Sequence, residues 1–543
     1  MHLIHDCATM LEIKDLTLEF GAAPTARRVV AGVSLTVKRG ETLVLVGESG
    51  SGKSITALSI LRLLPLAARV ITGQILIDDV DLLRLPLRRM PEFRGRRIGY
   101  VFQEPQTALN PVMTIGDQIG EVLTRHLGLR GAARTARIIA LLDAVGIAAA
   151  ARRRREYPHQ FSGGMKQRVM LAIALAGEPA YLIADEPTTA LDVTLQAQVL
   201  TLLREQQLAR QMGMLFITHD LAVAHQIADT IAVMKDGQIV EVGTREQIFH
   251  APQADYTRQL LAASPRLGGA PLPALPTARA AVPLLEVVAL NIRFPIRGGL
   301  FRRTTDTLHA VNNVSLTLAE GETLALVGES GSGKTTLGRG IVQLIDGSTG
   351  EVRLRGAALA ELSREALRQR RRDFQIVFQD PYASMNPRLT VHAIIEEGMV
   401  AQGVGGGRTE RRARLTQLMQ QVGLEPAMLE RYPHEFSGGQ RQRICIARAL
   451  AVEPKLLICD EPTSALDVSV QAQILTLLRE LQLNLGLAYV FITHNLAVVA
   501  SIAHRVAVMY QGQIVEIGPV NDVLYSPQHP YTRQLLAAVP RLP

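Results

Sequence analysis

One phosphate-binding pattern occurs twice in this chain of 543 residues, at residues 47–54 and 328–335. Both copies fit G-x-x-x-x-G-K-[S/T], and each follows a short apolar run, residues 42–46 and 323–327, that we predict to be a buried β-strand. A glycine-rich turn between a strand and a helix aims backbone N–H groups at phosphate oxygens, and the positive end of the helix adds to the attraction. The sequence therefore predicts two P-loops and two bound nucleoside triphosphates. The predicted binding residues are Gly47, Glu48, Ser49, Gly50, Ser51, Gly52, Lys53 and Ser54, with Gly328, Glu329, Ser330, Gly331, Ser332, Gly333, Lys334 and Thr335.

The two halves of the chain repeat one another beyond these loops. Lys53 and Lys334 are 281 positions apart, whereas three later pairs of motifs share a constant offset of 275. A segment rich in proline, residues 264–283, separates the copies and predicts a semi-extended linker. We therefore predict domains at residues 10–263 and 284–540. Within each, strands alternate with helices around the P-loop, which predicts an α/β fold with a parallel sheet covered on both faces.

Polar residues follow three further apolar strands in each half. In a parallel sheet the carboxyl ends of the strands line the ligand crevice, so we expect these side chains to face the P-loop. An aspartate there suits Mg²⁺, the adjacent glutamate suits activation of the attacking water, and a histidine or glutamine can contact phosphate, metal or water. Solvent-facing strand ends are the alternative interpretation, and the duplication argues against it. The residues are Gln103, Asp185, Glu186 and His219 in the first half, and Gln379, Asp460, Glu461 and His494 in the second.

A Ser-Gly-Gly sequence precedes an apolar helix in each half. Bare N–H groups, a hydroxyl and the positive helix end make such a start a second anion-binding element, although simple helix capping is an alternative explanation. If this element of one half closes over the P-loop of the other, ATP joins the halves. The residues are Ser162, Gly163, Gly164 and Met165, with Ser437, Gly438, Gly439 and Gln440.

The composition restricts the metal sites, the cellular compartment and the partners that can be expected for this chain. Three cysteines form no C-x-x-C pair or four-ligand metal site, and we expect Cys445 and Cys459 to pack in the core. We find no apolar run long enough to span a membrane and no evident signal peptide, so we expect the chain to stay on the cytoplasmic side. A net charge of +8 is compatible with nucleic acid or an anionic membrane face, and we interpret each arginine cluster as a solvated surface.

Taken in order, these motifs resemble those of the ATP-binding-cassette (ABC) ATPases, over nearly the whole chain. The sequence around each Ser-Gly-Gly (residues 157–164 and 432–439) and the two domain ends (residues 255–265 and 529–540) are similar to the oligopeptide/dipeptide/nickel importer branch. A fused tandem of this length resembles the single-chain ATPases of microcin C/oligopeptide importers, with the glutathione importers close by. The resemblance implies two tandem domains, each a P-loop parallel-sheet core with an antiparallel β subdomain and an α-helical subdomain.

The resemblance also implies roles. Phe20 and Phe294 are expected to stack on adenine, and the D-loops to lie at residues 190–192 and 465–467. ATP and Mg²⁺ are the expected cofactors, with no iron–sulfur cluster and no zinc. Expected partners are two transmembrane permease subunits and, through them, a periplasmic substrate-binding protein, at the cytoplasmic face of the bacterial inner membrane. The expected catalytic residues are Lys53, Glu186, His219, Lys334, Glu461 and His494, and the expected metal ligands are Ser54, Gln103, Asp185, Thr335, Gln379 and Asp460.

The predicted function is that of an ATPase motor that drives separate permeases for peptides or peptide-like compounds, with glutathione or nickel as alternative cargo. Two other classes stay open. A soluble tandem ATPase acting on ribosomes or nucleic acid fits the positive charge, but the short linker and the absence of zinc-binding cysteines argue against it. A nucleotide-binding scaffold with little turnover is disfavoured by the two intact Asp-Glu pairs.

Overall fold

The computed structural model describes residues 10–21, 26–188, 191–268, 282–298, 303–464 and 466–543. Internal contacts divide the chain into two compact units. Unit 1 comprises Met1–Leu191, Leu195–Ser264 and Pro540–Pro543, and unit 2 comprises Asp192–Thr194 and Pro265–Val539. The domain limits drawn from the sequence stay predictions, and residues 269–281 of the predicted linker lie outside the described residues.

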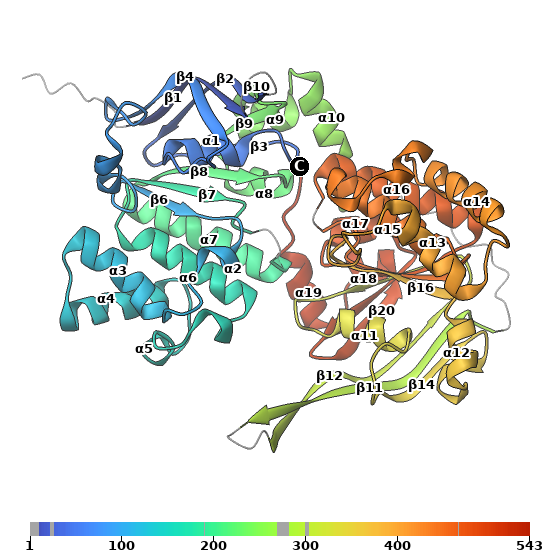
Figure 1. The fold of residues 1–543 in the computed structure, drawn as a ribbon. Helices are drawn as coiled ribbons and strands as arrows, with labels where there is room; N and C mark the ends of the chain where they lie inside the picture. Colours follow the sequence, from blue (N-terminus) through green and yellow to red (C-terminus); the bar gives the residue numbers. More distant parts are fainter. Residues whose placement is uncertain (1–9, 22–25, 189–190, 269–281, 299–302, 465) are drawn as a thin grey trace, which may run out of the picture. The chain divides into compact units, whose positions relative to one another are not determined.

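Unit 1 contains a four-stranded antiparallel sheet in the order β2–β1–β4–β5 (Figure 1). Alternate residues of β2, among them Val33, Leu35 and Val37, are buried, as expected when successive side chains of a strand point to opposite faces. The bounds are β1 Met10–Phe20, β2 Arg27–Lys38, β4 Ala68–Ile77 and β5 Val80–Asp81.

The second sheet of unit 1 has six strands in the order β10–β9–β3–β8–β7–β6. Five of them are parallel, which confirms the predicted α/β fold, whereas β10 runs antiparallel to β9. The exception has a local cause: Asp236 and Gly237 adopt φ of 47° and 81°, the left-handed pair of a tight two-residue hairpin turn. The bounds are β3 Thr42–Val46, β6 Ile98–Val101, β7 Tyr181–Asp185, β8 Gly213–Thr218, β9 Thr230–Lys235 and β10 Gln238–Thr244.

Helix α1 (Lys53–Ile60) packs between these two sheets. Its buried residues Ala57 and Ile60 belong to the same core as Ile13 of the antiparallel sheet and Leu45 of the mostly parallel one. This packing holds the P-loop, which leads into α1, in a fixed position relative to β3.

Three helices follow one another after β6 and α2: α3 (Ile115–Leu127), α4 (Gly131–Ala144) and α5 (Ala150–Arg153). Thr114 caps α3 by accepting a hydrogen bond from Asp117 N at 3.1 Å, and Gly128 ends it at φ 67°. The other helices of this half are α2 Pro105–Ala108, α6 Gly163–Ala176, α7 Val193–Arg210, α8 Leu221–Ile227, α9 Arg245–His250 and α10 Asp255–Ala263, with 3₁₀ turns η1 Leu87–Glu92 and η2 Pro158–Gln160.

Unit 2 repeats both sheets. Its antiparallel sheet has the order β12–β11–β14–β15, and its six-stranded sheet has the order β16–β17–β18–β13–β19–β20, again with one antiparallel edge strand, β20. The bounds are β11 Leu285–Gly298, β12 Arg303–Leu318, β13 Thr323–Val327, β14 Thr349–Leu354, β15 Ala357–Ala358, β16 Phe374–Val377, β17 Leu456–Asp460, β18 Ala488–Ile492, β19 Arg505–Tyr510 and β20 Gln513–Pro519.

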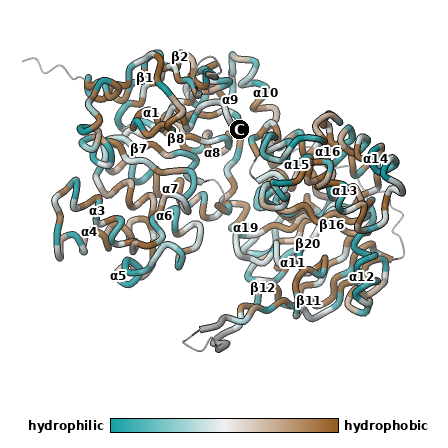
Figure 2. Tube along the Cα trace, viewed as in Figure 1, coloured by the Kyte–Doolittle hydropathy of each residue, from teal (hydrophilic) through white to brown (hydrophobic). Residues whose placement is uncertain are grey.

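Apolar layers cover both faces of the six-stranded sheet of unit 2. On one face Leu337 and Ile341 of α11 pack with Leu326 of β13, and on the other Val499 of α17 packs with Val327. Figure 2 shows the same segregation by hydropathy, with hydrophobic strands inside each unit and a hydrophilic α12 at the surface. The bounds are α11 Lys334–Ile341, α12 Arg364–Arg370, α13 Val391–Gln402, α14 Arg408–Gln421, α15 Gly438–Leu450, α16 Val468–Leu485, α17 Leu496–Ile502, α18 Val520–Tyr525 and α19 Pro530–Ala537, with η3 Leu359–Glu361, η4 Pro426–Glu430 and η5 Pro433–Glu435.

Candidate active sites

The two P-loops have nearly the same internal geometry. Lys53 Nζ donates to the carbonyl oxygens of Gly47 and Glu48 at 2.7 and 2.8 Å. Lys334 Nζ makes the equivalent bonds to Gly328 and Glu329 at 2.8 and 2.7 Å. Each lysine is buried, and burial lowers the pKa of Lys334 even though nearby carboxylates favour its charge. The loop therefore holds a cation at its centre, where phosphate oxygens can compete for it.

Close packing explains the first glycine of each P-loop. A Cβ on Gly47 would lie 2.2 Å from the carbonyl oxygen of Met234 in β9, and one on Gly328 would lie 2.2 Å from that of Met509 in β19. Gly52 and Gly333, which precede the helices, have φ of 103° and 101°, a region that side chains disfavour. The glycines are thus required by the fold of the loop itself, independently of any ligand.

A hydroxyl and a carboxylate meet beside each P-loop. Ser54 Oγ donates to Asp185 Oδ1 at 2.9 Å, and Thr335 Oγ1 donates to Asp460 Oδ1 at 2.9 Å. Burial raises the pKa of both aspartates, and the hydroxyl hydrogen bonds oppose that rise. A serine or threonine hydroxyl next to a carboxylate is a set of hard oxygen donors, so these residues fit Mg²⁺.

In unit 1, Glu186 lies between the glutamine and the histidine expected from the sequence. Gln103 Nε2 donates to Glu186 Oε2 at 3.0 Å, and His219 Nδ1 lies 3.3 Å from Glu186 Oε1. Burial disfavours the charged imidazole, but the hydrogen bond and charge of Glu186 outweigh it and raise the pKa of His219. Two side chains that follow neighbouring strands, Gln103 and His219, therefore converge on the carboxylate of Glu186.

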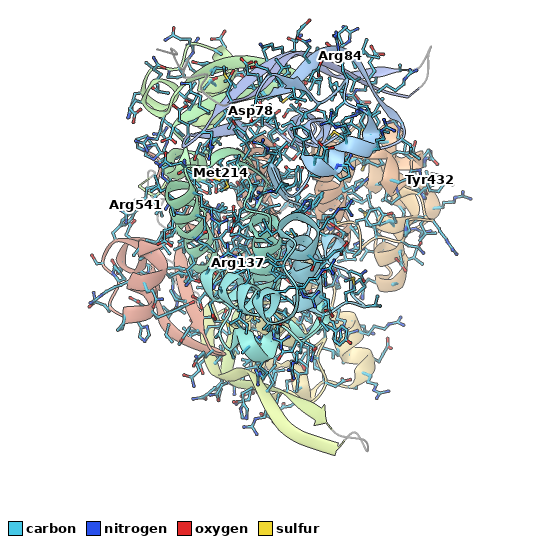
Figure 3. The ribbon with its side chains drawn as sticks, turned by 90° about the vertical axis from the view of Figure 1, so that its left-hand side faces the viewer. Asp78, Arg84, Arg137, Met214, Tyr432 and Arg541 are labelled. Atoms are coloured by element: carbon cyan, nitrogen blue, oxygen red, sulfur yellow. The ribbon has the colours of Figure 1, made fainter. Side chains whose placement is uncertain are left out.

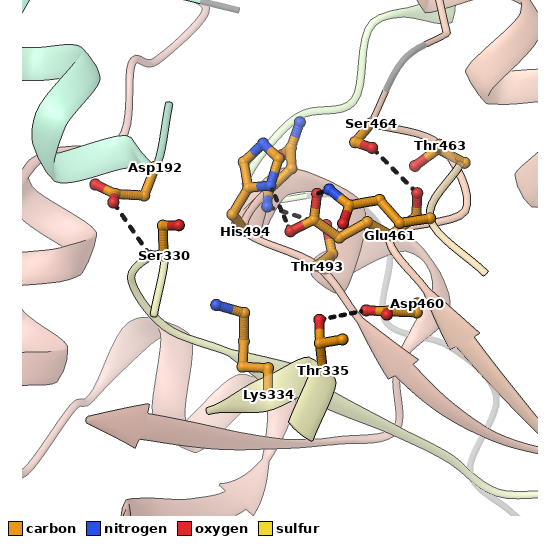
Figure 4. Close-up of polar contacts among 12 residues, drawn as sticks. Asp192, Ser330, Lys334, Thr335, Asp460, Glu461, Thr463, Ser464, Thr493 and His494 are labelled. Carbon is orange, nitrogen blue, oxygen red and sulfur yellow. Dashed lines mark hydrogen bonds and ion pairs between the residues drawn. The ribbon is translucent and has the colours of Figure 1, made fainter. Parts of the chain in front are cut away.

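Unit 2 has the same constellation (Figure 4). Gln379 Nε2 donates to Glu461 Oε2 at 3.2 Å, and His494 Nδ1 lies 3.3 Å from Glu461 Oε1. Burial disfavours the ionised glutamate, yet the hydrogen bond and charge of His494, with the charge of Lys334, lower the pKa of Glu461. Glu461 is consequently ionised near neutral pH and able to accept a proton.

Both glutamates adopt a strained backbone conformation. Glu186 and Glu461 each have φ of 47°, in the left-handed region that is unfavourable for a residue with a side chain. Their N–H groups donate to the carbonyl oxygens of Ile217 and Ile492 at 3.0 and 2.9 Å, which ties them to the neighbouring strand. Such strain is typical of residues whose position serves a ligand or a reaction.

Each Ser-Gly-Gly forms the start of a helix. Ser162 caps α6 by accepting from Met165 N, and Ser437 caps α15 by accepting from Gln440 N, both at 3.4 Å. Gln440 Oε1 also accepts from Ser437 N at 3.0 Å, a reciprocal bond that Met165 cannot make. Helix capping is thus part of the role of both serines, which are exposed. Phosphate binding by these helix starts stays a prediction, as it does for Gly163, Gly164, Gly438 and Gly439.

The two aromatic residues expected to contact adenine lie on the antiparallel sheets. Phe20 is the last residue of β1, opposite Arg27 of β2, and Phe294 of β11 is 39% exposed. The role of both stays a prediction. Of the D-loops, Ala190 and Ala465 lie outside the described residues. Asp192 Oδ2 accepts a hydrogen bond from Ser330 N at 3.1 Å (Figure 4).

One residue of the unit 1 site, Tyr100, carries no signal in the sequence that predicts its role. Tyr100 of β6 donates its hydroxyl to Asp185 Oδ2 at 3.0 Å, so Asp185 receives two hydroxyl hydrogen bonds. Counting from Gln103 and Gln379, the corresponding residue of unit 2 is Ile376, which cannot donate. Cys445 and Cys459 are buried, as expected.

Comparison with known proteins identifies matching families. Residues 30–189 and 311–464 match the model of the ABC transporter family. Residues 240–290 and 515–543 match the model of the oligopeptide/dipeptide transporter C-terminal region. Among the described residues, the structure contains no helix that is both long enough and apolar enough to cross a membrane.

The similar proteins include glutathione import ATP-binding proteins GsiA. Those of Salmonella paratyphi A and Escherichia coli O157:H7 are each 49% identical, over 98% of this chain and 90% of theirs. That of Pectobacterium atrosepticum is 49% identical over 98% of this chain and 89% of its own. Among solved structures, the ATP-binding cassette MJ0796 bound to ADP and Pi is 28% identical, with a TM-score of 0.39 over 43% of this chain and 98% of that chain.

Proposed function

This chain belongs to the ABC transporter family and is an ATP-binding ATPase, and on that premise we propose that it drives import of peptide-like compounds through separate permeases. The proposed cargo class includes glutathione, because the similar GsiA proteins are named for glutathione import. The match to the oligopeptide/dipeptide transporter C-terminal region in both halves supports a peptide-like cargo. We propose two transmembrane permease subunits and a periplasmic substrate-binding protein as partners, and a peripheral location at the cytoplasmic face of the inner membrane.

One observation carries the proposed hydrolysis: the glutamate–histidine–glutamine arrangement is present in both units. The Glu–His distance is 3.3 Å in each, and the Gln–Glu distances are 3.0 and 3.2 Å. A structural role alone would not require the same strained glutamate, φ 47°, beside both P-loops. The repetition supports two hydrolytic sites.

In the proposed mechanism the P-loop amides and Lys53 or Lys334 bind the β- and γ-phosphates and stabilise the charge that develops on them. Ser54 with Asp185, and Thr335 with Asp460, would hold Mg²⁺ together with Gln103 or Gln379. When bound, Mg²⁺ would neutralise phosphate charge and so favour departure of ADP.

The glutamate is the proposed general base. Glu186 or Glu461 accepts a proton from the attacking water, and its histidine orients the carboxylate through the Nδ1 contact. The glutamine amide bonds the other carboxylate oxygen and so fixes the plane of the carboxylate. Pairing of each P-loop with the Ser-Gly-Gly of the other half stays a prediction from the sequence.

The experiment replaces Glu186 and Glu461 with glutamine, singly and together, and measures ATP turnover by the purified chain. Loss of a general base lowers the rate by about 10²–10⁴-fold, so each single change should remove the turnover of its own site and the double change should remove nearly all. Glu205→Gln is the matched control, since Glu205 is exposed on α7. If either single variant keeps full turnover, the assignment of two hydrolytic sites is wrong.

The cargo is tested separately. Cells that express the chain with its permeases are assayed for uptake of labelled glutathione and of a labelled oligopeptide, with the Glu186→Gln, Glu461→Gln chain as the inactive reference. Uptake of neither, together with co-purification of the chain with ribosomes or nucleic acid, would favour the alternative of a soluble ATPase acting on those partners. The net charge of +8 is the observation behind that alternative.

A further inference from the structure

A pocket of about 630 Å³ in unit 1 is lined mainly by arginine. We call it the arginine pocket; its charged residues are Arg39, Arg96, Arg97, Arg137, Glu178 and Arg210. Arg39 precedes β3, Arg97 precedes β6, and Arg210 ends α7 just before β8. These positions are at the amino ends of the parallel strands, whereas the P-loop, Asp185 and His219 follow their carboxyl ends. The arginine pocket is therefore distinct from the ATP site of unit 1.

The pocket carries an excess of positive charge. Five arginines face one glutamate, a formal net charge of +4. Arg137 pairs with Glu178 at 2.7 Å, and Arg97 pairs with Asp78, which lies outside the lining, at 3.3 Å (Figure 3 labels Asp78 and Arg137). Two of the five guanidinium groups are thus partly neutralised.

The other three arginines bond to main-chain carbonyl oxygens. Arg39 donates to Gln211 O at 3.3 Å, Arg96 to Gly177 O at 3.2 Å, and Arg210 to Leu175 O at 3.3 Å. A neutral carbonyl does not cancel their charge, and each guanidinium has five N–H donors, so several remain for a ligand. Burial lowers the pKa of Arg210, and the charge of Arg137 lowers it further, as expected for two neighbouring cations, whereas the charge of Glu178 raises it.

Unit 2 provides an internal comparison. Ala180 N and Tyr181 N both donate to Arg97 O, and Lys455 N and Leu456 N both donate to Asp373 O, so Arg97 and Asp373 are equivalent. The Arg137–Glu178 pair likewise corresponds to Arg414–Glu453 at 3.3 Å. The residues of unit 2 at the positions of Arg39, Arg96, Arg97, Arg137, Glu178, Ala180 and Arg210 are Glu320, Arg372, Asp373, Arg414, Glu453, Lys455 and Leu485.

The excess positive charge of the arginine pocket is absent from the equivalent residues of unit 2. Three cations face three carboxylates there, and the corresponding pocket is about 230 Å³ with Leu450, Leu485 and Leu487 in its lining. Since the same fold forms without the excess charge, the arginines of unit 1 are not needed for folding. Accumulating them costs electrostatic free energy, which a bound anion would offset.

We propose that the arginine pocket binds a small molecule bearing several phosphate groups. Arginine binds phosphate through two parallel N–H···O bonds, and it keeps its charge when partly buried. A volume of about 630 Å³ is within the usual range for small-molecule pockets. Because the strands β3, β7 and β8 lead from this edge to the P-loop, Asp185 and His219, a bound anion is positioned to influence ATP hydrolysis in unit 1.

The test measures binding of sodium tripolyphosphate by titration calorimetry. The full chain carries Lys53→Ala and Lys334→Ala, so that the P-loops do not contribute. Into this chain we introduce Arg39→Glu or, separately, Arg210→Leu, which are the residues that unit 2 has at these positions. Arg88→Glu is the control with the same change of charge as Arg39→Glu, because Arg88 is exposed and outside the pocket lining.

We expect Arg39→Glu and Arg210→Leu each to weaken tripolyphosphate binding at least about tenfold, and Arg88→Glu to change it less than about twofold. Thermal unfolding of the variants verifies that they remain folded. A second arm measures binding to phosphatidylcholine vesicles with and without phosphatidylglycerol. Loss of vesicle binding in Arg39→Glu but not in Arg88→Glu, without tripolyphosphate binding, identifies the phosphate source as a lipid headgroup. Binding of neither probe, or equal losses in Arg39→Glu and Arg88→Glu, overturns the proposal.

Discussion

The hydroxyl group of Tyr100 distinguishes Asp185 of the unit 1 site from Asp460 of the unit 2 site. The hydrogen bond from Tyr100 lowers the pKa of Asp185 against the larger effect of burial, and Asp460 has no such donor because Ile376 stands at the corresponding position. Both aspartates have raised pKa values, and burial is the first cause in each case. The ionised form needed to hold a cation therefore accepts two hydroxyl hydrogen bonds in unit 1 and one in unit 2.

We predict that Tyr100→Phe moves the acidic limb of the ATPase pH profile of unit 1 to higher pH. Removing a hydrogen bond to the ionised form raises the pKa of Asp185 further, so the carboxylate is protonated, and activity is lost, at a higher pH than before. Near neutral pH the turnover should fall about twofold to tenfold, as expected for a hydrogen bond worth about 0.5–1.5 kcal/mol. The measurement is ATPase activity against pH in a Glu461→Gln background, which isolates the unit 1 site.

The chain offers a matched control for this change. In a Glu186→Gln background only the unit 2 site is expected to turn over, and Tyr100→Phe should leave its pH profile unchanged. An unchanged profile in the Glu461→Gln background would mean that the Tyr100 hydrogen bond does not tune Asp185.

The sequence could predict the convergence on each glutamate but not the part played by Tyr100. Gln103, Glu186 and His219 all follow apolar strands, and parallel strands bring their carboxyl ends to one edge. Tyr100 is instead a residue within β6, where an aromatic side chain is as expected in packing as in a site. Its contact depends on the register of β6 beside β7, which periodicity does not specify.

At the scale of elements, the strand before each P-loop was the most predictable feature. Residues 42–46 and 323–327 form β3 and β13 with the predicted limits, because a short apolar run next to a glycine-rich turn is a strong local signal. The order β2–β1–β4–β5 was not predictable, since β4 follows the P-loop helix and returns to pair with the first strand. Such pairings depend on packing between segments far apart in sequence.

The helix starts at the Ser-Gly-Gly elements give a prediction at this scale. A Cβ on Gly163 would meet nothing within 4 Å, and Gly163 has no positive φ, so the fold does not require glycine there. We predict that Gly163→Ala leaves thermal stability unchanged or higher, because alanine favours a helix over glycine by about 1 kcal/mol. ATP turnover should nevertheless fall about tenfold or more, since a methyl group would hinder approach of phosphate to the bare N–H groups.

Gly398→Ala is the control for this prediction, because Gly398 lies within α13 and its Cβ would make an ordinary contact with Val452 at 3.5 Å. Thermal unfolding and steady-state ATPase assays are made on both variants. Full activity of Gly163→Ala would leave helix capping as the only role of this element.

For the whole molecule, duplication predicts what the units share but not where they differ. The equal Glu–His distances follow from the repeated motifs. The arginine pocket could not be predicted, because Arg39, Arg97, Arg137 and Arg210 are far apart in sequence. Only the fold brings them to one edge of the sheet.

The two P-loops are expected to contribute separately to the stabilisation of the chain by bound nucleotide. Each lysine is held by its own loop, Lys53 by Gly47 O and Lys334 by Gly328 O, so each site should bind a triphosphate through its own unit. A ligand at 100 times its Kd stabilises the protein that binds it by about 2.7 kcal/mol, and about 1 kcal/mol raises the Tm of a domain of this size by about 2–4 °C. Calorimetric unfolding with a non-hydrolysable ATP analogue should therefore show that Lys53→Ala and Lys334→Ala each remove part of the ligand-induced stabilisation and that the double variant removes it all. The same scans without the analogue give the Tm of each unliganded variant, and so measure how much each lysine stabilises the chain when no ligand is bound. Stabilisation that persists in the double variant would show that the analogue binds elsewhere, and the arginine pocket, tested by adding Arg39→Glu, is then the first place to look.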